Sequence, residues 1–419
     1  MWSWFPEVRE RCAERSTATN GMRCLRDSRR ACVGVAVLAA AWLAGSEARG
    51  AEYSLDPSLG VRTEYNDNIL LTVLPHQDVF GVWVSPALAF KAETEKLKVE
   101  SNMQADFVRY YGQEGLDITN FFFPLSSSYQ TERQRFGLNG TVTRENTLVG
   151  ELQQTGVVNR RTQRNLRTAN PSWSLGLTEH LTFQSDYSFS DVTYTDGARF
   201  GLFDYQLHSG SAGLSYKLTE RDDASFSAYY VNFVAPTLGF RSVFPGAQGA
   251  LTHKFSESFE ASLHGGVRFA TASVPVLGGG KQTDRDTIVL FGADVVKRWD
   301  TMTVSAGYSR DIFPSGAGLL VQTDHYSASW SWDLTKRLTA SVTGNAYQIS
   351  AIAQAQALPN SLYLVVEPRL HWRWSEWWST DLTYHHARLE IDAGDLQASQ
   401  NAVFATATFH WPAKLARSR

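Results

Sequence analysis

The chain has 419 residues, a formal net charge of −3, 12% aromatic residues and a mean hydropathy of −0.26. Only one apolar run, at residues 31–44, approaches the length of a membrane helix, which excludes a multi-helix membrane protein. No basic patch points to nucleic acid, so we expect no nucleic-acid partner. The composition fits a β-barrel whose alternate residues face lipid, although a soluble all-β protein would share it.

The first 50 residues predict a signal peptide. Arg26, Arg29 and Arg30 form a basic cluster ahead of the apolar run, which is short and alanine-rich for a membrane anchor. The small residues of the Ala-Arg-Gly run at 48–50 predict cleavage before Ala51. An uncleaved anchor is the alternative. Met22 is an alternative start, because residues 1–21 make an unusual leader.

The three cysteines, Cys12, Cys24 and Cys32, all lie in this leader. We therefore expect no disulfide after export into an oxidising periplasm. Arg-Arg-Ala precedes Cys32 in place of an apolar lipobox, so lipidation is not expected. The leader holds eight arginines and five acidic residues, which leaves a formal charge near −6 on the mature chain.

From Tyr53 onward the dominant hydrophobic period is two, which predicts β-strands. Segments such as 181–190, 326–334 and 338–346 alternate apolar with polar residues over about 9–11 positions, the length of a tilted strand that crosses a bilayer. The apolar face mixes Leu, Val, Ala and Gly with aromatic residues near strand ends. That mixture is typical of a lipid-facing belt with aromatic girdles.

Short charged turns recur about every 40 residues and alternate with longer polar or Gly/Pro-rich segments, as in outer-membrane barrels. The turns are expected at 93–96, 131–134, 178–180, 219–223, 256–258, 297–300, 335–337 and 375–376. The longer segments are expected at 112–119, 145–168, 192–206, 235–246, 271–286, 311–323, 350–360 and 392–399.

Eight hairpins, a first strand at 53–65 and a last strand at 402–411 predict an all-β, up-and-down antiparallel transmembrane barrel of 18 strands, with 16 as the alternative. An even number places both termini in the periplasm. Alternate residues of the last strand form an apolar face like the C-terminal signal for the barrel-assembly machinery: Val403, Ala405, Ala407, Phe409 and Trp411. Most such proteins end at the aromatic residue, whereas this chain continues as a short periplasmic tail, 412–419.

No catalytic or metal-binding motif is recognisable, so we expect neither an enzyme nor a cofactor. His385 and His386 are adjacent and should face opposite sides of a strand. The glycine run before Lys281 lacks P-loop spacing, and no Gly-x-Ser-x-Gly elbow occurs. A Ser–His pair on neighbouring strands stays open, because serine is abundant.

Charged residues on the polar faces of the strands are predicted to line the interior. Each can serve simply to neutralise a water-filled lumen, or together they can form a constriction that selects solutes. Sixteen to eighteen strands leave an aqueous channel unless a plug fills it, and no plug domain is visible in the sequence. The candidate pore-lining residues are Arg62, Glu64, Lys98, Glu100, Asp106, Asp186, Arg268, His371, Arg373 and Asp381.

The opening of the mature chain resembles a known family. The run YSLDPSLG at 53–60 leads into YNDNI at 65–69, followed by SPAL at 85–88 and a Tyr pair at 110–111. This is similar to the outer-membrane β-barrel porins found near exopolysaccharide and surface-sorting gene clusters. The likeness covers about 60 residues and implies a Gram-negative outer-membrane location. We expect the YNDN run to form a turn, in preference to a cation site.

Two functions follow as hypotheses. The first is a porin-like, water-filled conduit for solutes or surface polymer. The second is a non-conducting accessory barrel in exopolysaccharide export or cell-surface assembly. The expected partners are outer-membrane lipid, the barrel-assembly machinery and, for either function, polysaccharide or polysaccharide-export proteins.

Overall fold

The computed structural model describes residues 52–73, 76–113, 115–147, 162–276, 280–352, 359–392, 396–411 and 416–417. Side chains near the tip of one hairpin, 272–282 and 284, are not described. The predicted signal peptide, its cleavage site and the three cysteines lie outside these ranges, as does most of the tail. Within them, no helix is long and apolar enough to cross a membrane.

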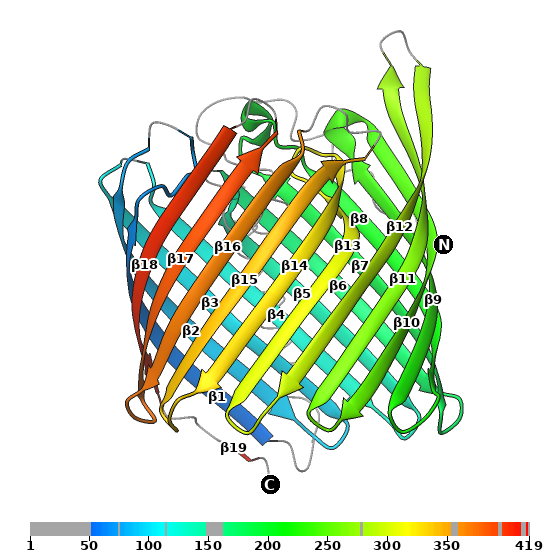
Figure 1. Cartoon of the computed structure of the whole chain (residues 1–419), viewed down its shortest axis with the longest axis horizontal. Coiled ribbons are helices and arrows are strands. Elements are labelled where there is room, and N and C mark those ends of the chain that lie inside the picture. Colours follow the sequence, from blue (N-terminus) through cyan, green and yellow to red (C-terminus); the bar gives the residue numbers. More distant parts are fainter. Residues whose placement is uncertain are drawn as a thin grey trace, which may run out of the picture. The chain divides into compact units, whose positions relative to one another are not determined.

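The chain folds into consecutive antiparallel strands, shown in Figure 1. They are β1 (Glu52–Asn66), β2 (Val79–Glu93), β3 (Leu97–Tyr111), β4 (Ile118–Gln130), β5 (Gln134–Asn146), β6 (Gln163–Gly176), β7 (Leu181–Tyr194), β8 (Tyr205–Lys217), β9 (Asp222–Ala235), β10 (Phe240–Ser256), β11 (Phe259–Val276), β12 (Gly280–Arg298), β13 (Met302–Pro314), β14 (Leu320–Asp333), β15 (Leu338–Ala351), β16 (Ser361–Arg373), β17 (Trp378–Ile391) and β18 (Leu396–His410), with a short strand β19 (Ala416–Arg417). Two short 3-10 helices, η1 (Gly197–Phe200) and η2 (Pro236–Leu238), lie in connections.

The sheet closes on itself. Each strand from β1 to β18 pairs with its neighbours in sequence, and β1 also pairs with β18, in register from Ser58 opposite His410 to Asn66 opposite Ala402. Closure removes both free edges, so every wall strand is hydrogen-bonded on two sides. The prediction of an 18-strand antiparallel barrel is confirmed, and the 16-strand alternative is excluded. Because the number is even, the barrel begins and ends at the same rim.

The tail adds one feature that the sequence did not predict. Ala416 and Arg417 form β19, which pairs with Tyr53 and Glu52 at the start of β1. The peptide N–H of Trp411 also donates to the carbonyl of Pro57 at 3.0 Å. Residues 416–417 are therefore paired with the first strand at this rim.

One rim consists of short turns with a common chemistry. All eight predicted turns lie between strands as expected. In six of them a Thr or Ser hydroxyl accepts the backbone N–H three residues later, as in Thr94 with Leu97 at 2.9 Å and Ser375 with Trp378 at 3.1 Å. This local bond closes a tight reversal without help from the rest of the fold. The other four hydroxyls belong to Thr131, Thr178, Thr219 and Thr335.

The opposite rim differs in part from the prediction. The segments expected as loops at 235–246, 271–286 and 311–323 are mainly strand, because β-pairing continues beyond the bilayer-crossing part of each hairpin. Strands are accordingly 13–19 residues long, longer than the 9–11 residues expected. The β11–β12 hairpin extends farthest from the rim, as Figure 1 shows.

Alternation along paired strands divides the side chains into an outer and an interior face. Large apolar residues on the outer face are exposed, among them Phe226, Leu263, Val289 and Leu382 at 52–61%. Trp332, Trp372, Trp374, Trp378 and Trp411 gather on the outer face near the short-turn rim, and the rings of Trp372 and Trp374 stack with centroids 4.1 Å apart. An exposed apolar belt edged by aromatic rings is the surface of a transmembrane barrel.

Candidate functional site

All ten candidate pore-lining residues lie on the interior face. Strand pairing fixes this, since residues opposite each other in a ladder share a face: Arg62 pairs with Trp83 and Thr406, Glu100 with Ser126, and Ser172 with Asp186. Arg62, Glu64, Asp106 and Asp381 border one cavity. Lys98, Glu100 and Asp186 border another.

The remaining three candidates occupy other parts of the interior wall. Arg268 forms an ion pair with Asp311 at 2.9 Å, and its Nε donates to the Tyr229 hydroxyl at 3.3 Å. His371 contacts Asp381 beside the first cavity. Arg373 lies at the short-turn rim, where it donates to the carbonyl of Lys336.

We call the first space the charged cavity. It has a volume of about 600 Å³ and is formed by consecutive strands of the closed wall, β16–β18 and β1–β5. Its lining combines charged with aromatic side chains: Arg62, Glu64, Trp83, Asp106, Tyr110, Phe122, Tyr363, Glu367, Arg369, Asp381, His385 and Phe404.

Glu64 anchors the β1–β3 wall of the charged cavity. Its side chain is 97% buried and accepts three hydrogen bonds: from Trp83 Nε1 at 2.9 Å, from the Tyr110 hydroxyl at 3.2 Å and from Asn66 Nδ2 at 3.1 Å. A buried carboxylate is stable only when such donors replace water. The three donors therefore hold two aromatic rings in fixed orientations against the wall.

Arg62 lies between two aromatic rings. Its guanidinium carbon is 3.6 Å from the centroid of Trp83 and 4.8 Å from that of Phe404, which are cation–π distances. Its Nε has no hydrogen-bond partner. The guanidinium group of Arg62 is thus held in position by the two ring faces, and its Nε–H donates no hydrogen bond.

The β16–β17 wall carries two further carboxylates. Asp381 accepts from Arg369 Nε at 2.7 Å and contacts His371 Nδ1 at 2.8 Å, while Glu367 contacts His385 Nδ1 at 2.9 Å. In all, four carboxylates and two guanidinium groups border the charged cavity. The excess of negative charge in a confined, low-dielectric wall attracts cations and repels anions.

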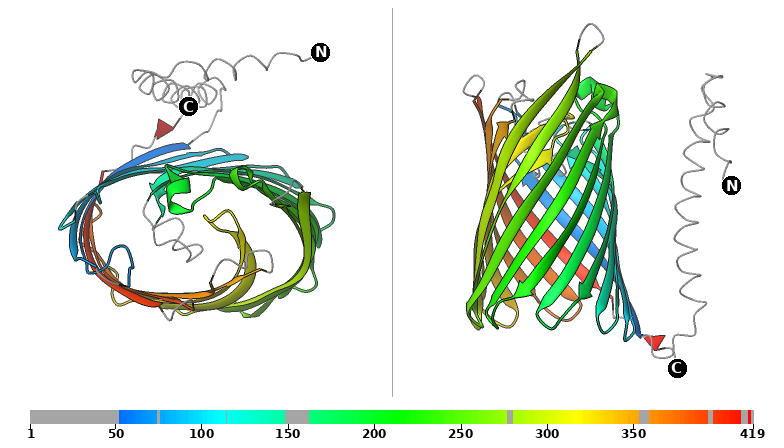
Figure 2. Two further views of the ribbon diagram at one scale, coloured as in Figure 1. Left: turned by 90° about the horizontal axis from the view of Figure 1, so that it is seen from above. Right: turned by 90° about the vertical axis from the view of Figure 1, so that its right-hand side faces the viewer.

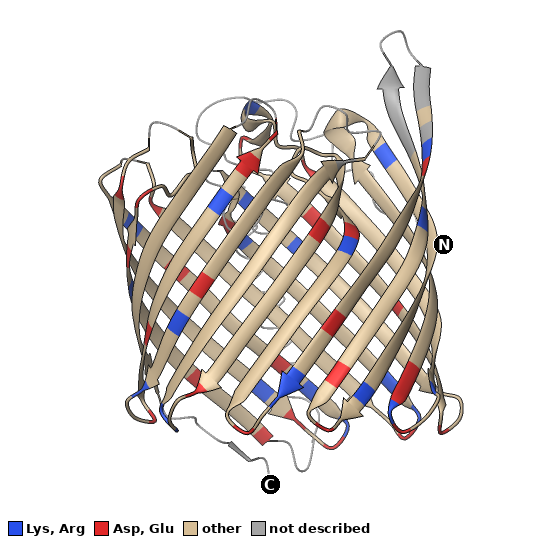
Figure 3. Ribbon diagram, viewed as in Figure 1, with Lys and Arg blue, Asp and Glu red and all other residues tan. Residues whose placement is uncertain are grey.

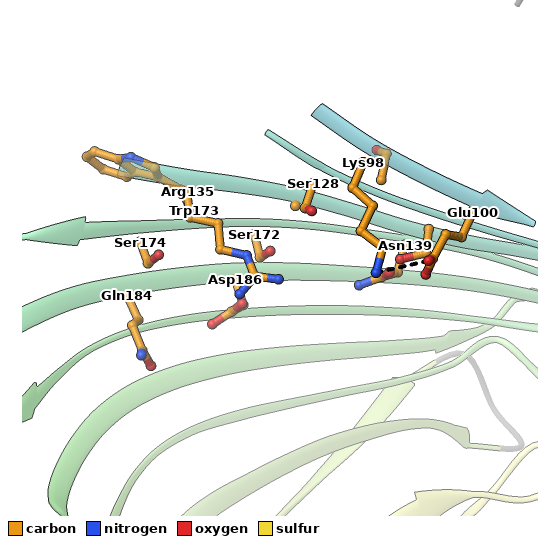
Figure 4. A pocket seen from close by; sticks show the side chains of 13 residues that line it. Lys98, Glu100, Ser128, Arg135, Asn139, Ser172, Trp173, Ser174, Gln184 and Asp186 are labelled. Atoms are coloured by element: carbon orange, nitrogen blue, oxygen red, sulfur yellow. Dashed lines mark ion pairs between the residues drawn. The ribbon is translucent and has the colours of Figure 1, made fainter. Parts of the chain in front are cut away.

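The second space, of about 360 Å³, is lined by small polar groups (Figure 4). Serine hydroxyls and the Asn139 amide alternate there with charges, and Lys98 forms an ion pair with Glu100 at 2.9 Å. Figure 4 shows the ring of Trp173 on the other side of its strand from these groups, in agreement with its pairing with Phe136 on the outer face. This part of the wall offers both hydrogen-bond donors and hydrogen-bond acceptors to water and solutes.

Apolar clusters narrow the interior at the long-loop rim. The β1–β2 connection turns inward, and Leu71, 99% buried, packs against Tyr363, Val365 and Leu389. The β13–β14 hairpin also bends inward, so that Leu320 joins a cluster with Phe233 and Phe240 on β9 and β10. Figure 2 shows both segments within the ring of strands.

Specific bonds hold the tip of the β13–β14 hairpin. The N–H of Phe203 donates to the carbonyl of Gly316 at 2.8 Å. Gly318 has a φ of +72°, and a Cβ there would lie 2.6 Å from Leu238 Cδ1. Only glycine readily adopts this φ and also leaves room for the Leu238 side chain.

The expected turn starts later than predicted: Tyr65 and Asn66 are the last residues of β1, and the turn begins at Asn68, whose carbonyl accepts the N–H of Leu71 at 2.9 Å. Asn68 Oδ1 accepts the N–H of Thr72 at 3.0 Å, and its Nδ2 donates to the carbonyls of Thr72 and Ser399 at 2.8 and 2.9 Å. Asp67 accepts both the N–H and the side-chain amide of Asn401. These side chains fix the inward turn to β18 across the closing seam of the barrel.

Three charged residues of the cavity, Glu367, Arg369 and His385, were missed from the sequence. The signal was present, since Glu367 and Arg369 continue the alternation of His371 and Arg373 along β16. Trp83 and Phe404 could not have been found in this way, because β2 is apolar on both faces and aromatic residues are expected toward lipid. His385 and His386 do face opposite sides: His385 contacts Glu367 inside, and His386 contacts Asn401 outside.

No protein-family model and no curated protein matches the chain. Among solved structures the chain is similar to OccAB3 of Acinetobacter baumannii, with 12% identity, 86% of this chain and 99% of that chain covered, and a TM-score of 0.41. It is similar to OccK5 (OpdH) of Pseudomonas aeruginosa, with 13% identity, 86% and 98% covered, and a TM-score of 0.44. It is also similar to OccK2 (OpdF) of Pseudomonas aeruginosa, solved in complex with glucuronate, with 10% identity, 85% and 98% covered, and a TM-score of 0.45.

Proposed function

We propose that this chain is a porin-like barrel of a bacterial outer membrane that forms a water-filled conduit for small solutes. The observation that carries the proposal is the interior face of the closed 18-strand wall, which is charged, hydroxyl-rich and hollowed by two cavities. Barrels of 16–18 strands enclose an aqueous channel, and charged groups on the interior face would be costly unless water reached them. Export through a cleaved signal peptide and folding by the barrel-assembly machinery are parts of the proposal.

In this function the predicted interior residues face the permeating solution, apart from Glu64 and Asp106, which are buried within the wall. The charged cavity supplies the selective step, because Arg62, held between the rings of Trp83 and Phe404, lies beside four carboxylates. Such a wall suits polyhydroxylated or cationic solutes, which can donate hydrogen bonds to carboxylates.

Conductance in a planar lipid bilayer tests the conduit. The purified barrel, shown to be folded by its heat-modifiable gel mobility, is expected to produce stepwise ion currents. A folded barrel that inserts and carries no current would refute the proposal.

A second function is favoured by the inward segments at the long-loop rim. Leu71 and Leu320 are buried in apolar clusters on the interior wall, as in a barrel that is closed at one end. Together with the resemblance of residues 53–111 to porins of exopolysaccharide gene clusters, this supports a non-conducting accessory barrel in polysaccharide export or surface assembly. Deleting the gene would then abolish surface polymer and leave the permeability of the envelope to small solutes unchanged.

A further inference from the structure

Arginines gather on the outer face of the barrel near the long-loop rim. Each lies within the last five strand residues at that rim, on the side that carries the exposed apolar belt. Five are exposed and Arg310 is half-buried. We call this set the arginine belt: Arg109, Arg144, Arg167, Arg241, Arg310 and Arg388.

The opposite rim has no such set. Near the short turns, Lys297 is the only lysine or arginine on the outer face of the strands that the structure describes, and its Nζ donates to Ser258. Other cations at that rim lie in the turns, such as Lys96, Arg133 and Arg221, or on the interior face, such as Arg373. Figure 3 shows charges of both signs in these turns, below a largely uncharged wall.

Half of the arginine belt lacks a compensating carboxylate. Arg310 is paired with Asp324 and Arg388 with Glu390, and Arg167 is 3.4 Å from Asp191. By contrast, Arg144 donates to Gln163, Arg241 donates to Asn232, and Arg109 lies 5.8 Å from the ring centroid of Tyr111. Among the described residues these last three form no ion pair, so their guanidinium groups keep donors and charge available.

The belt lies where lipid head groups begin. Exposed aromatic residues, Phe107, Tyr111 and Tyr384, are on the same face within a few residues of belt arginines. Aromatic rings at this position mark the interface between hydrocarbon and water. Arginine binds phosphate with two parallel hydrogen bonds, whereas the ammonium of lysine acts as a point charge.

From this placement we infer that the arginine belt binds the phosphate groups of phosphorylated glycolipid in the outer leaflet around the barrel. The inference rests on the proposed outer-membrane location and not on conduction. Because the unpaired arginines lie on β3, β5 and β10, on different sides of the wall, the lipid contacts are distributed around the barrel and hold its long-loop rim at the membrane surface.

Lipid titration of the folded full-length barrel in detergent tests the inference. The probe is purified lipopolysaccharide, and the readout is the temperature at which the heat-modifiable band converts to the unfolded band. Wild type is expected to show a rise in this temperature that saturates. The triple variant Arg109→Gln, Arg144→Gln, Arg241→Gln should need about tenfold more lipid for half of that rise, which corresponds to 1.4 kcal/mol.

Three comparisons make the result specific. The matched variant Lys96→Gln, Arg133→Gln, Arg221→Gln removes the same charge from the short-turn rim and should respond like wild type. Dephosphorylated glycolipid, and inorganic phosphate in phosphatidylcholine vesicles, should each give no rise. A full rise with either of these, or an equal response of the two triple variants, would overturn the inference.

Single variants Arg109→Gln and Arg241→Gln decide the matter if the triple variant does not fold. Each leaves five belt arginines and should lower lipid affinity two- to threefold; wild-type affinity in both would overturn the inference. Ion conductance is recorded from the same preparations. An intact lipid response without current would refute the conduit alone, while current without a lipid response would refute the belt alone.

Discussion

At the residue scale, the buried polar side chains of this barrel differ in how fully they are hydrogen-bonded: Glu64 and Asn68 have several partners, whereas the Nε of Arg62 has none. Asn68 is 98% buried, and both its oxygen and its nitrogen are used, on Thr72 and on Ser399 across the seam. Burial of an amide is unfavourable unless each polar atom finds a partner. Asn68 therefore contributes strongly to the inward turn after β1, together with Asp67 and the packing of Leu71.

Replacement of Asn68 by alanine should release this turn. The change leaves the N–H of Thr72 and the carbonyl of Ser399 without their partner, which destabilises the folded barrel by about 2 kcal/mol. We expect a lower temperature of heat-modifiable unfolding and faster proteolysis near residue 73. Gln113→Ala, in the β3–β4 connection, is the control and should behave as wild type. An unchanged cleavage rate in Asn68→Ala would show that the turn is held by Leu71 packing alone.

At the element scale, one face of each strand is in contact with lipid and the other faces the lumen. On β14, Ala328 is exposed on the outer face and pairs with Ala306 and Gly344, whereas Ser329 is interior and its hydroxyl is 2.7 Å from that of Ser305. Trp330 again lies on the outer face. The same period of two that predicted the strand thus assigns lipid to one residue and the lumen to the next.

Arginine at these adjacent positions should therefore have unequal effects. Ala328→Arg places a guanidinium in the lipid belt, at a cost of about 2–4 kcal/mol near the bilayer midplane. Ser329→Arg faces water and should cost far less, while changing the conductance of an open pore. Folding into lipid vesicles, followed by gel mobility, measures the difference, with Trp330→Arg as a second lipid-side variant. Equal and mild effects would contradict the assignment of faces.

At the scale of the whole molecule, closure brings residues far apart in sequence into one site. The charged cavity joins Arg62 and Glu64 near the start of the barrel to Glu367, Arg369 and Asp381 near its end, because β1 pairs with β18. Neither group of strands could build the cavity alone. Its carboxylates outnumber its guanidinium groups, which gives the proposed conduit a negatively charged wall that favours cations.

The conduit should prefer cations. We expect the reversal potential in a KCl gradient to indicate K⁺ selectivity that weakens at high salt, as screening shortens the range of wall charges. The double variant Glu367→Gln, Asp381→Asn removes two of the four cavity carboxylates and should shift the reversal potential toward zero. Glu390→Gln, which neutralises a carboxylate on the outer face of β17, should leave it unchanged. Anion preference in wild type would contradict the charge argument.

Processing of the leader is a separate prediction for the whole chain. If cleavage falls before Ala51, N-terminal sequencing of the outer-membrane form should begin Ala-Glu-Tyr-Ser. Finding Cys32 in the mature protein would instead indicate an uncleaved leader.

The sequence by itself determined the hairpins, their short turns and the alternation of the two faces, and it favoured 18 strands over 16. Local chemistry sufficed for this: the Thr and Ser hydroxyls close the short turns, and a period of two separates Ala328 from Ser329 whatever the rest of the chain does. The ten interior positions followed from the same rule.

The site was decided only by tertiary structure. Which charges meet depends on the register across the β1–β18 seam, and no local pattern encodes that register; Arg62 thereby lies beside Phe404, and Asn68 beside Ser399. The inward course of the β13–β14 hairpin was likewise hidden, because its alternation continues through Pro314 and Leu320 and is equally compatible with a strand that extends outward. Packing of Leu320 against β9 and β10 selects the inward course, since it buries apolar surface that would otherwise face water at the rim.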